Sequence, residues 1–341
     1  MLPDELPDGR APLFVITGFL GSGKTTLLNG LLSHPETRDT AVLINEFGEI
    51  GIDNLLVSEI RENLVLLESG CVCCSVLDDL SGAIKDLFAK REARDIPYFK
   101  RLVLETTGLA DPAPIVHTLM DEAAMSLLIY LDSVIATVDG VLGKRELEEH
   151  DEALKQAIVA DRLVVTKSDL ADPAEIALLM ERLSGLNPGA PILRVVGGKI
   201  SPEELLGGGM QTIGHTRKGV SEWLHDEAIH AAGTRPHAEI GTFAVRVETP
   251  IVWRAFTRWV GATLDRCGDR VLRLKAVLNV KDFDQPRVFQ AVQRVIYPTV
   301  SLPAWPDADR SSRIVAITRG LPPDEVAGLK RELETALGLR A

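Results

Sequence analysis

The sequence predicts an α/β protein with two domains: a larger one built on a mostly parallel, doubly wound sheet, and a smaller α+β one. Short runs of Val, Ile and Leu alternate with helical patterns from Leu13 to about residue 206, the order that parallel strands with crossover helices produce. The tract Gly207-Gly208-Gly209 then breaks this alternation. Beyond residue 239 the order is β-α-β-β-β-α, which indicates an antiparallel sheet with two helices. We therefore expect domains at residues 1–206 and 239–341, joined by a linker at 207–238.

The elements follow from these patterns. Near-continuous apolar runs are typical of strands buried on both faces. In the first domain they predict strands at Leu13–Thr17, Ala41–Asn45, Val65–Glu68, Leu102–Glu105, Val134–Asp139, Leu163–Thr166 and Ile192–Val196. Helical periodicity between them predicts Lys24–Ser33, Val76–Arg94, Pro112–Glu122, Asp151–Ala160 and Ala174–Leu186. In the second domain the expected strands are Thr242–Val247, Val271–Val280, Val288–Val295 and Arg313–Thr318, and the expected helices Ile251–Arg266 and Asp324–Leu337. The linker is expected to hold one short helix near residues 222–230.

Composition and charge exclude several kinds of partner. The net charge of −12 argues against general binding to nucleic acid, because a polyanion would be repelled. No run of 18 apolar residues is present, so no membrane-spanning helix is expected. The first twelve residues are polar and lack the features of a secretory signal, which favours a cytoplasmic protein with reduced thiols. Cys267 stands alone in a helical pattern and is expected to be a buried apolar residue.

A phosphate-binding loop follows the first predicted strand. Residues 18–25 read Gly-Phe-Leu-Gly-Ser-Gly-Lys-Thr and match the P-loop motif G-x-x-x-x-G-K-[ST] in full, between a strand and a helix. Lys24 brings a cation to the β- and γ-phosphates, and Thr25 can ligate Mg²⁺. The residues expected to surround the phosphates are Gly18, Gly21, Ser22, Gly23, Lys24 and Thr25. The first domain is therefore expected to be a P-loop NTPase.

The base is expected to be guanine. Thr166-Lys167-Ser168-Asp169 follows a predicted strand, where guanine-specific NTPases have Asn-Lys-x-Asp. Asp169 would accept hydrogen bonds from N1–H and the 2-amino group of guanine, and the stem of Lys167 would lie along the base. Thr166 replaces the usual Asn and can supply only part of its hydrogen bonding. The alternative is a solvated turn that caps the next helix.

A strand that ends in an acidic residue is expected to lie near the γ-phosphate. Glu105 closes an apolar strand and can hold Mg²⁺ through water, and the amide of Gly108 can contact the γ-phosphate. The reaction would be in-line attack by water on that phosphate. The sequence identifies no arginine finger, so slow intrinsic hydrolysis is expected. The alternative for Glu105 is a carboxylate that caps the following helix.

Three cysteines predict a metal site. Cys71, Cys73 and Cys74 follow Gly70 and would fill three positions of a tetrahedral Zn²⁺ site, with Co²⁺ or Ni²⁺ also acceptable. No fourth ligand is adjacent, which suits a metal that arrives and leaves. A redox pair of Cys71 with Cys74, or thiols packed beneath the sheet, are the alternatives.

Two glutamates lie between the P-loop and the cysteines in the sequence. Glu46 and Glu49 flank a Phe-Gly turn after a strand, so one could contact Mg²⁺ and the other could approach the thiolate-bound metal. We take Glu49 as a candidate zinc ligand and Glu46 as a candidate catalytic residue. A solvated acidic turn is the alternative.

These motifs together resemble the CobW family of metal-handling P-loop GTPases, which includes YjiA-type proteins. The similar stretches are GFLGSGKTTLLN, INEFGEIGID, ESGCVCC, LETTGLADPAPIV and TKSD, and in the second domain RLKAVLNV, QAVQRVIYP and AWPDADRSSRIVAIT. The resemblance implies a GTP-dependent zinc metallochaperone with Cys71, Cys73 and Cys74 as ligands. It adds Thr26 to the phosphate site and makes Glu46 and Glu49 the first switch. Unlike many members, this chain has sparse linker histidines.

The expected function is a GTPase that loads a divalent metal, zinc first, onto a client metalloprotein. The second domain would face the client, and a homodimer is left open. No nucleic acid or membrane partner is expected. Two other functions compete: a P-loop kinase or transferase acting on a small molecule, and a non-enzymatic metal sensor or store that holds nucleotide only as a structural ligand.

Overall fold

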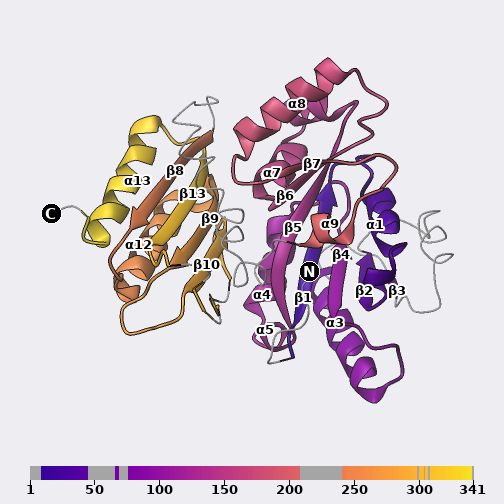
Figure 1. The fold of residues 1–341 in the computed structure, drawn as a ribbon, viewed down its shortest axis with the longest axis horizontal. Helices are drawn as coiled ribbons and strands as arrows, with labels where there is room; N and C mark the ends of the chain where they lie inside the picture. Colours follow the sequence, from indigo (N-terminus) through magenta and orange to yellow (C-terminus); the bar gives the residue numbers. More distant parts are fainter. Residues whose placement is uncertain are drawn as a thin grey trace. The chain divides into compact units, whose positions relative to one another are not determined.

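The structure, a computed structural model, describes residues 9–44, 66–68, 76–207, 240–297, 299–302, 304–305 and 308–339 (Figure 1). The chain divides into two compact units. The first is Met1–Leu183 with Pro191–Gly207, and the second is Ser184–Ala190 with Gly208–Ala341. The predicted linker helix near residues 222–230 lies outside the described residues.

The described part of the first unit is built on a seven-stranded sheet in the order β3-β2-β4-β1-β5-β6-β7. Every neighbouring pair in it is parallel. The strands are β1 (Ala11–Gly18), β2 (Thr40–Ile44), β3 (Leu66–Glu68), β4 (Arg101–Glu105), β5 (Ile129–Asp139), β6 (Arg162–Thr166) and β7 (Ile192–Arg194). The strand order reverses at β1, which lies between β4 and β5. Ligands of doubly wound sheets bind at such a reversal, outside the carboxyl ends of the strands.

Helices lie in the connections between these strands that the structure describes, as a parallel sheet requires. They are α1 (Lys24–Leu32), the 3₁₀ turn η1 (Pro35–Thr37), α3 (Val76–Ala93), α4 (Pro112–Asp121), α5 (Met125–Leu128), α6 (Gly143–Glu149), α7 (Asp151–Val159), α8 (Pro173–Leu186) and α9 (Pro202–Leu206). Leu27, Leu28 and Leu31 of α1 are fully buried in one cluster with Phe14 and Ile16 of β1. Helix α7 contacts β1 and β5. Strand β1 is thereby fixed by packing, and the loop that follows it starts from a rigid base.

The described part of the second unit is a six-stranded sheet with two long helices. Its order is β11-β10-β9-β13-β8, with β12 paired to β10, and the pairs are antiparallel. The strands are β8 (Ile240–Val247), β9 (Val271–Leu278), β10 (Arg287–Val292), β11 (Val295–Ile296), β12 (Val300–Ser301) and β13 (Ser312–Arg319). The helices are α12 (Trp253–Cys267), followed by the turn η3 (Gly268–Arg270), and α13 (Pro323–Ala336).

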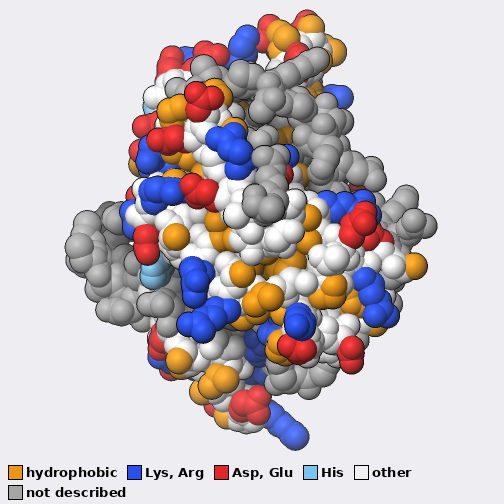
Figure 2. All heavy atoms as spheres, turned by 90° about the vertical axis from the view of Figure 1, so that its left-hand side faces the viewer, with side chains coloured by type: hydrophobic (Ala, Val, Ile, Leu, Met, Phe, Trp, Pro, Cys, Tyr) orange, Lys and Arg blue, Asp and Glu red, His pale blue; other side chains and the backbone are white. Residues whose placement is uncertain are grey.

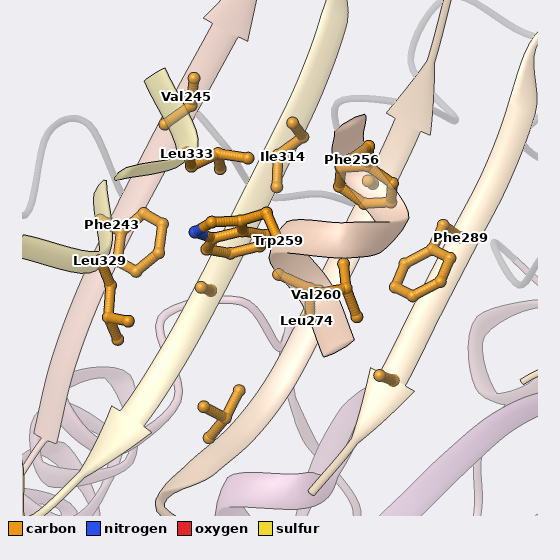
Figure 3. Close-up of a cluster of buried hydrophobic side chains, with 14 of the residues drawn as sticks. Phe243, Val245, Phe256, Trp259, Val260, Leu274, Phe289, Ile314, Leu329 and Leu333 are labelled. Carbon is orange, nitrogen blue, oxygen red and sulfur yellow. The ribbon is translucent and has the colours of Figure 1, made fainter. Parts of the chain in front are cut away.

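Aromatic side chains pack among aliphatic ones in the core of this second unit (Figure 3). The rings of Phe256 on α12 and Phe289 on β10 meet edge to face, with centroids 5.0 Å apart. Trp259, one turn along α12 from Phe256, meets Phe243 of β8 in the same way at 6.4 Å. Edge-to-face pairs add to the free energy that burial already contributes. Cys267 lies in the same cluster and is 7% exposed, as expected for a buried apolar residue.

The predicted fold class is confirmed: a mostly parallel sheet with P-loop NTPase order, and a smaller α+β unit. Strand β5 is longer than predicted and begins at Ile129, because the buried polar pair Asp132 and Ser133 interrupts its apolar run. The predicted strand Ile192–Val196 ends early at Arg194, and Val196 instead bridges Lys199.

The surface mixes charged and apolar side chains. On the face shown in Figure 2, Lys and Arg are interspersed with Asp and Glu between small hydrophobic areas. Within the described ranges, no helix combines the length and the apolar character that crossing a bilayer requires.

Candidate nucleotide site

The P-loop curls at the carboxyl end of β1 because its glycines adopt positive φ. Gly18, Gly21 and Gly23 have φ of 142°, 73° and 91°, a region that other residues rarely enter. A Cβ atom on Gly18 would lie 2.2 Å from Oγ1 of Thr137, so only glycine fits there. Lys24 Nζ donates to the carbonyl oxygens of Gly18 at 3.0 Å and Phe19 at 3.2 Å, which holds the ammonium group within the loop.

Buried hydroxyl groups tie this loop to β5. Ser22 Oγ donates to the Phe19 carbonyl at 2.7 Å and lies 2.7 Å from Oγ1 of Thr137. Thr137 Oγ1 donates to the Thr17 carbonyl at 3.2 Å. Ser22 and Thr137 are 0% and 2% exposed, so these hydrogen bonds do not compete with water. The loop is therefore fixed by the sheet as well as by its own turns.

The structure brings the two predicted magnesium residues together. Thr25 Oγ1, at the start of α1, donates to Oε1 of Glu105, at the end of β4, at 2.7 Å, although 80 positions separate them. A hydroxyl and a carboxylate side by side are hard oxygen donors, the ligands that Mg²⁺ prefers. The residues present therefore fit a magnesium ion, which Thr25 and Glu105 would hold. The carboxylate that caps α4 is Asp111, which accepts from Ala113 N at 3.0 Å.

The loop after β4 lies against the P-loop. Thr106 N donates to the Ile16 carbonyl at 2.9 Å, and Thr106 Oγ1 donates to Oγ1 of Thr17 at 3.0 Å. A Cβ atom on Gly108 would lie 2.8 Å from the Cα and N atoms of Leu20 and 2.7 Å from its Cδ2. The main chain at Gly108 thus reaches the middle of the P-loop, the place expected for a group that contacts the γ-phosphate.

Lys167 joins the predicted base loop to the P-loop. Its Nζ donates to the Gly21 carbonyl at 2.8 Å and to Oδ2 of Asp139, at the end of β5, at 2.7 Å. The other oxygen of Asp139 accepts from the N–H groups of Val141 and Leu142. Burial raises the pKa of Asp139, but these hydrogen bonds outweigh it, so the pKa lies below its ordinary value. Asp139 is therefore charged at neutral pH and orients Lys167.

Thr166 also contacts the P-loop. Its Oγ1 donates to the Ser22 carbonyl at 2.7 Å and lies 3.3 Å from the Val138 carbonyl. Asp169, three residues on, is exposed at the same edge. The cap of the next helix, α8, is Asp172, which accepts from Ala174 N at 2.8 Å. The turn thus leaves the carboxylate of Asp169 accessible to a ligand, while Thr166 fixes the loop beneath it.

Replacing Thr166 with valine is expected to lower the free energy of unfolding by about 1–3 kcal/mol, because the buried Ser22 carbonyl loses its donor. Denaturant unfolding measures this change. The matched control is Thr257→Val on α12, whose hydroxyl donates only to its own helix at 3.1 Å, and its effect is expected to be below about 0.5 kcal/mol. Equal effects of the two substitutions would contradict this role for Thr166.

Several residues of this edge were not predicted. Thr137 and Asp139 belong to the predicted strand Val134–Asp139. The apolar pattern of that strand gives no sign that Thr137 contacts Ser22 of the P-loop or that Asp139 pairs with Lys167. The loop after β7 also lies on α1: a Cβ atom on Gly198 would be 2.3 Å from the Thr26 carbonyl, and one on Gly30 would be 2.0 Å from the Gly198 carbonyl. The glycine pair that follows β7 is the sequence signal that could have indicated this close approach.

The predicted metal site belongs to segments that the structure does not describe. Cys71, Cys73, Cys74, Glu46 and Glu49 lie outside the described residues. Among the residues that the structure does describe, no three His, Cys, Asp or Glu side chains are grouped to hold a metal ion.

Fold and loops define a P-loop nucleotide-binding protein with a second, antiparallel α+β unit. The chain belongs to the CobW/HypB/UreG family: the nucleotide-binding domain of that family matches residues 12–194, and the cobalamin synthesis protein cobW C-terminal domain matches residues 240–337. The family predicted from the motifs is thus confirmed.

Named relatives cover nearly the whole chain. The zinc chaperone YjiA of Escherichia coli is 33% identical, over 93% of this chain and 98% of the relative. The zinc chaperone CobW of a Sinorhizobium species is 28% identical, over 83% of this chain and 86% of its own. The crystal structure of Zn(II)-bound YjiA GTPase from E. coli has a TM-score of 0.67 at 28% identity and covers 95% of this chain and 99% of that one.

Proposed function

We propose that this protein is a GTPase that binds zinc at Cys71, Cys73 and Cys74 and delivers it to a client protein, with metal affinity coupled to the bound nucleotide. The proposal that the protein binds and hydrolyses GTP rests on the hydrogen bond of 2.7 Å between Thr25 and Glu105. This bond brings the end of the P-loop next to the carboxylate at the end of β4. The zinc half is supported by relatives named zinc chaperones that match over most of the chain. We propose domain limits at 1–206 and 239–341, with a linker at 207–238.

The proposed reaction is hydrolysis of GTP to GDP and phosphate. A water oxygen attacks the γ-phosphorus in line, the bond to the β–γ bridging oxygen breaks, and the water releases a proton to solvent. Lys24 and the main-chain amides of Gly21–Thr26 hold the phosphates, and the Gly108 amide donates to the γ-phosphate. Asp169 and Lys167 hold guanine. Mg²⁺, when bound at Thr25 and Glu105, would neutralise charge that develops on the phosphates.

The metal is cargo in this proposal. The three thiolates favour Zn²⁺ and accept Co²⁺ or Ni²⁺. Glu49 would approach the thiolate-bound metal and Glu46 the magnesium, so that these two switch residues connect the sites. If GTP changes zinc affinity, zinc must change GTP affinity by the same factor. The client would dock on the second unit.

The decisive experiment measures GTP turnover and zinc affinity on the same protein. The proposal expects phosphate release from GTP, and a zinc affinity that differs between the GTP-bound and GDP-bound protein. Phosphate transferred only to an added small-molecule acceptor would favour a kinase. Bound GTP without turnover, and zinc affinity independent of nucleotide, would favour a sensor or store.

Replacing Cys71, Cys73 and Cys74 with serine is expected to weaken zinc binding by at least about three orders of magnitude, because thiolates supply most of the affinity of such sites. GTP affinity is expected to stay within a few-fold. Competition with a chelator measures the first, and fluorescent nucleotide titration the second. Cys267→Ser is the control, because this thiol lies in the core of the second unit and should not bind zinc. Unchanged zinc affinity in the triple variant would reject the site.

A further inference from the structure

Gln156 connects helix α7 to the loop that follows β4. It lies in the middle of α7 and is 1% exposed. Its Nε2 donates to two main-chain carbonyls of that loop, Gly108 at 3.2 Å and Ala110 at 2.9 Å. We infer that Gln156 is a positioning residue, which holds the Gly108 main chain where it contacts the γ-phosphate. The inference rests on the proposed function, because it assigns a role within the same GTP site.

The two acceptors decide how the amide of Gln156 is oriented. A side-chain amide has a donor end and an acceptor end, and only the NH₂ group can serve two carbonyls. Oε1 is buried and has no hydrogen-bond partner among the described residues. A buried acceptor without a partner costs free energy. A leucine would avoid this cost inside the core, but it would leave the carbonyls of Gly108 and Ala110 without this donor.

Helix α7 contacts both the P-loop and the segment that follows β4. At its N-cap, the ring of His150 stacks on Phe19 of the P-loop, with centroids 4.5 Å apart and an interplanar angle of 22°. Lys155, beside Gln156, lies 3.8 Å from Asp111, the cap of α4. Gln156 also lines a small cavity together with Phe19 and Thr137. The stacking of His150 on Phe19 fixes the position of α7 relative to the P-loop. Gln156, on the same helix, therefore holds Gly108 at a fixed position relative to that loop.

Loss of the Gln156 hydrogen bonds is expected to affect binding of the γ-phosphate but not of the α- and β-phosphates. Gly108 lies against Leu20 of the P-loop, and the P-loop has its own anchors in Thr137, Thr166 and Lys167. Loss of the Gln156 hydrogen bonds would therefore loosen the loop after β4 and leave the site for the α- and β-phosphates in place. A residue that served stability alone would change the affinities for GTP and GDP equally, or neither of them.

The test compares Gln156→Leu with wild type, using GDP, a non-hydrolysable GTP analogue and GTP turnover. Affinity for GDP is expected to stay within about twofold. Affinity for the GTP analogue and kcat are expected to fall by about 10- to 100-fold, as the loss of two buried hydrogen bonds implies.

Gln156→Glu is the second variant. Its carboxylate would repel both carbonyls at high pH, and its protonated form can donate, so its preference for the GTP analogue is expected to recover as pH falls.

The matched control is Gln290→Leu in β10 of the second unit. Gln290 is also a buried glutamine, 2% exposed, and its Oε1 accepts from Arg273 at 3.0 Å. It is expected to lower the melting temperature and to leave the ratio of GTP-analogue to GDP affinity unchanged. The same ratio and kcat in Gln156→Leu as in wild type would overturn the inference. If Gln156→Leu does not fold, a Gln156→Glu ratio equal to wild type at every pH would overturn it.

Failure of the proposed function is distinguishable from failure of this inference. A wild-type protein that binds GDP and the GTP analogue but does not release phosphate from GTP would reject the proposed hydrolysis. The affinity ratio of the Gln156 variants would still decide the role of Gln156. A wild-type protein that binds neither nucleotide would overturn both.

Discussion

Lys24→Ala is expected to weaken binding of GTP and GDP by about a hundredfold or more. Hydrogen bonds from a charged donor contribute about 1.5–3 kcal/mol each, and the ammonium group of Lys24 is held at the loop by the carbonyls of Gly18 and Phe19. Titration with fluorescent nucleotide measures the loss. Any change in zinc affinity on addition of GTP should disappear in the same variant.

The control for Lys24 is Lys144→Ala. Lys144 lies on α6, and its side chain is 52% exposed beside Glu175 at 3.9 Å. It removes the same charge from the protein, but at an exposed residue outside the predicted nucleotide site, so nucleotide affinity is expected to stay within about twofold. A Lys24→Ala protein whose zinc affinity still responds to GTP as in wild type would reject the coupling between the two sites.

Gly108→Ala is expected to lower kcat for GTP by about 100-fold, the effect of a 1 Å displacement at a reacting group. The new Cβ would lie 2.8 Å from main-chain atoms of Leu20, and a backbone cannot turn aside as a flexible side chain can. The P-loop is held by Ser22, Thr166 and Lys167, so the loop after β4 should move instead. Affinity for GDP is therefore expected to change less than affinity for GTP.

Gly82→Ala on α3 is the control for Gly108. A Cβ atom on Gly82 would meet no atom within 4 Å, so alanine is expected to stabilise the helix by about 0.5–1 kcal/mol without a change in turnover. Single-turnover phosphate release compares the two variants. A Gly108→Ala protein with wild-type kcat would show that the main chain at Gly108 does not need its present position for catalysis.

Much of the fold could be predicted because the first sheet is parallel. Strands β1, β2, β4 and β5 are buried along their whole length, so they read as largely apolar runs that local composition reveals. Helix α1 begins at Lys24, as the motif requires. Helices α5, α6 and α9 were missed, because elements of four to seven residues show too few turns for periodicity. Strands β11 and β12 were missed for the same reason, since each has two residues.

In the candidate site, too, local sequence motifs could be recognised, whereas roles that depend on contacts distant in the sequence could not. The P-loop and the loop expected to hold the base were identified from contiguous motifs, and the structure brings the two loops into contact at one sheet edge. Gln156 could not, because its importance comes from contacts with Gly108 and Ala110, 48 and 46 positions away in the chain. In the sequence it is one polar residue within an amphipathic helix. The role of Asp139 is equally tertiary, since it depends on Lys167, 28 positions away.

The hydrogen bonds from Lys167 to Gly21 and from Thr166 to Ser22 have a thermodynamic consequence. They join the loop expected to hold the base and the loop expected to hold the phosphates into one preorganised cradle. A ligand that enters such a cradle loses little free energy to conformational ordering of these loops. More of the intrinsic binding energy then remains to change the rest of the protein, which is what a nucleotide-driven switch requires.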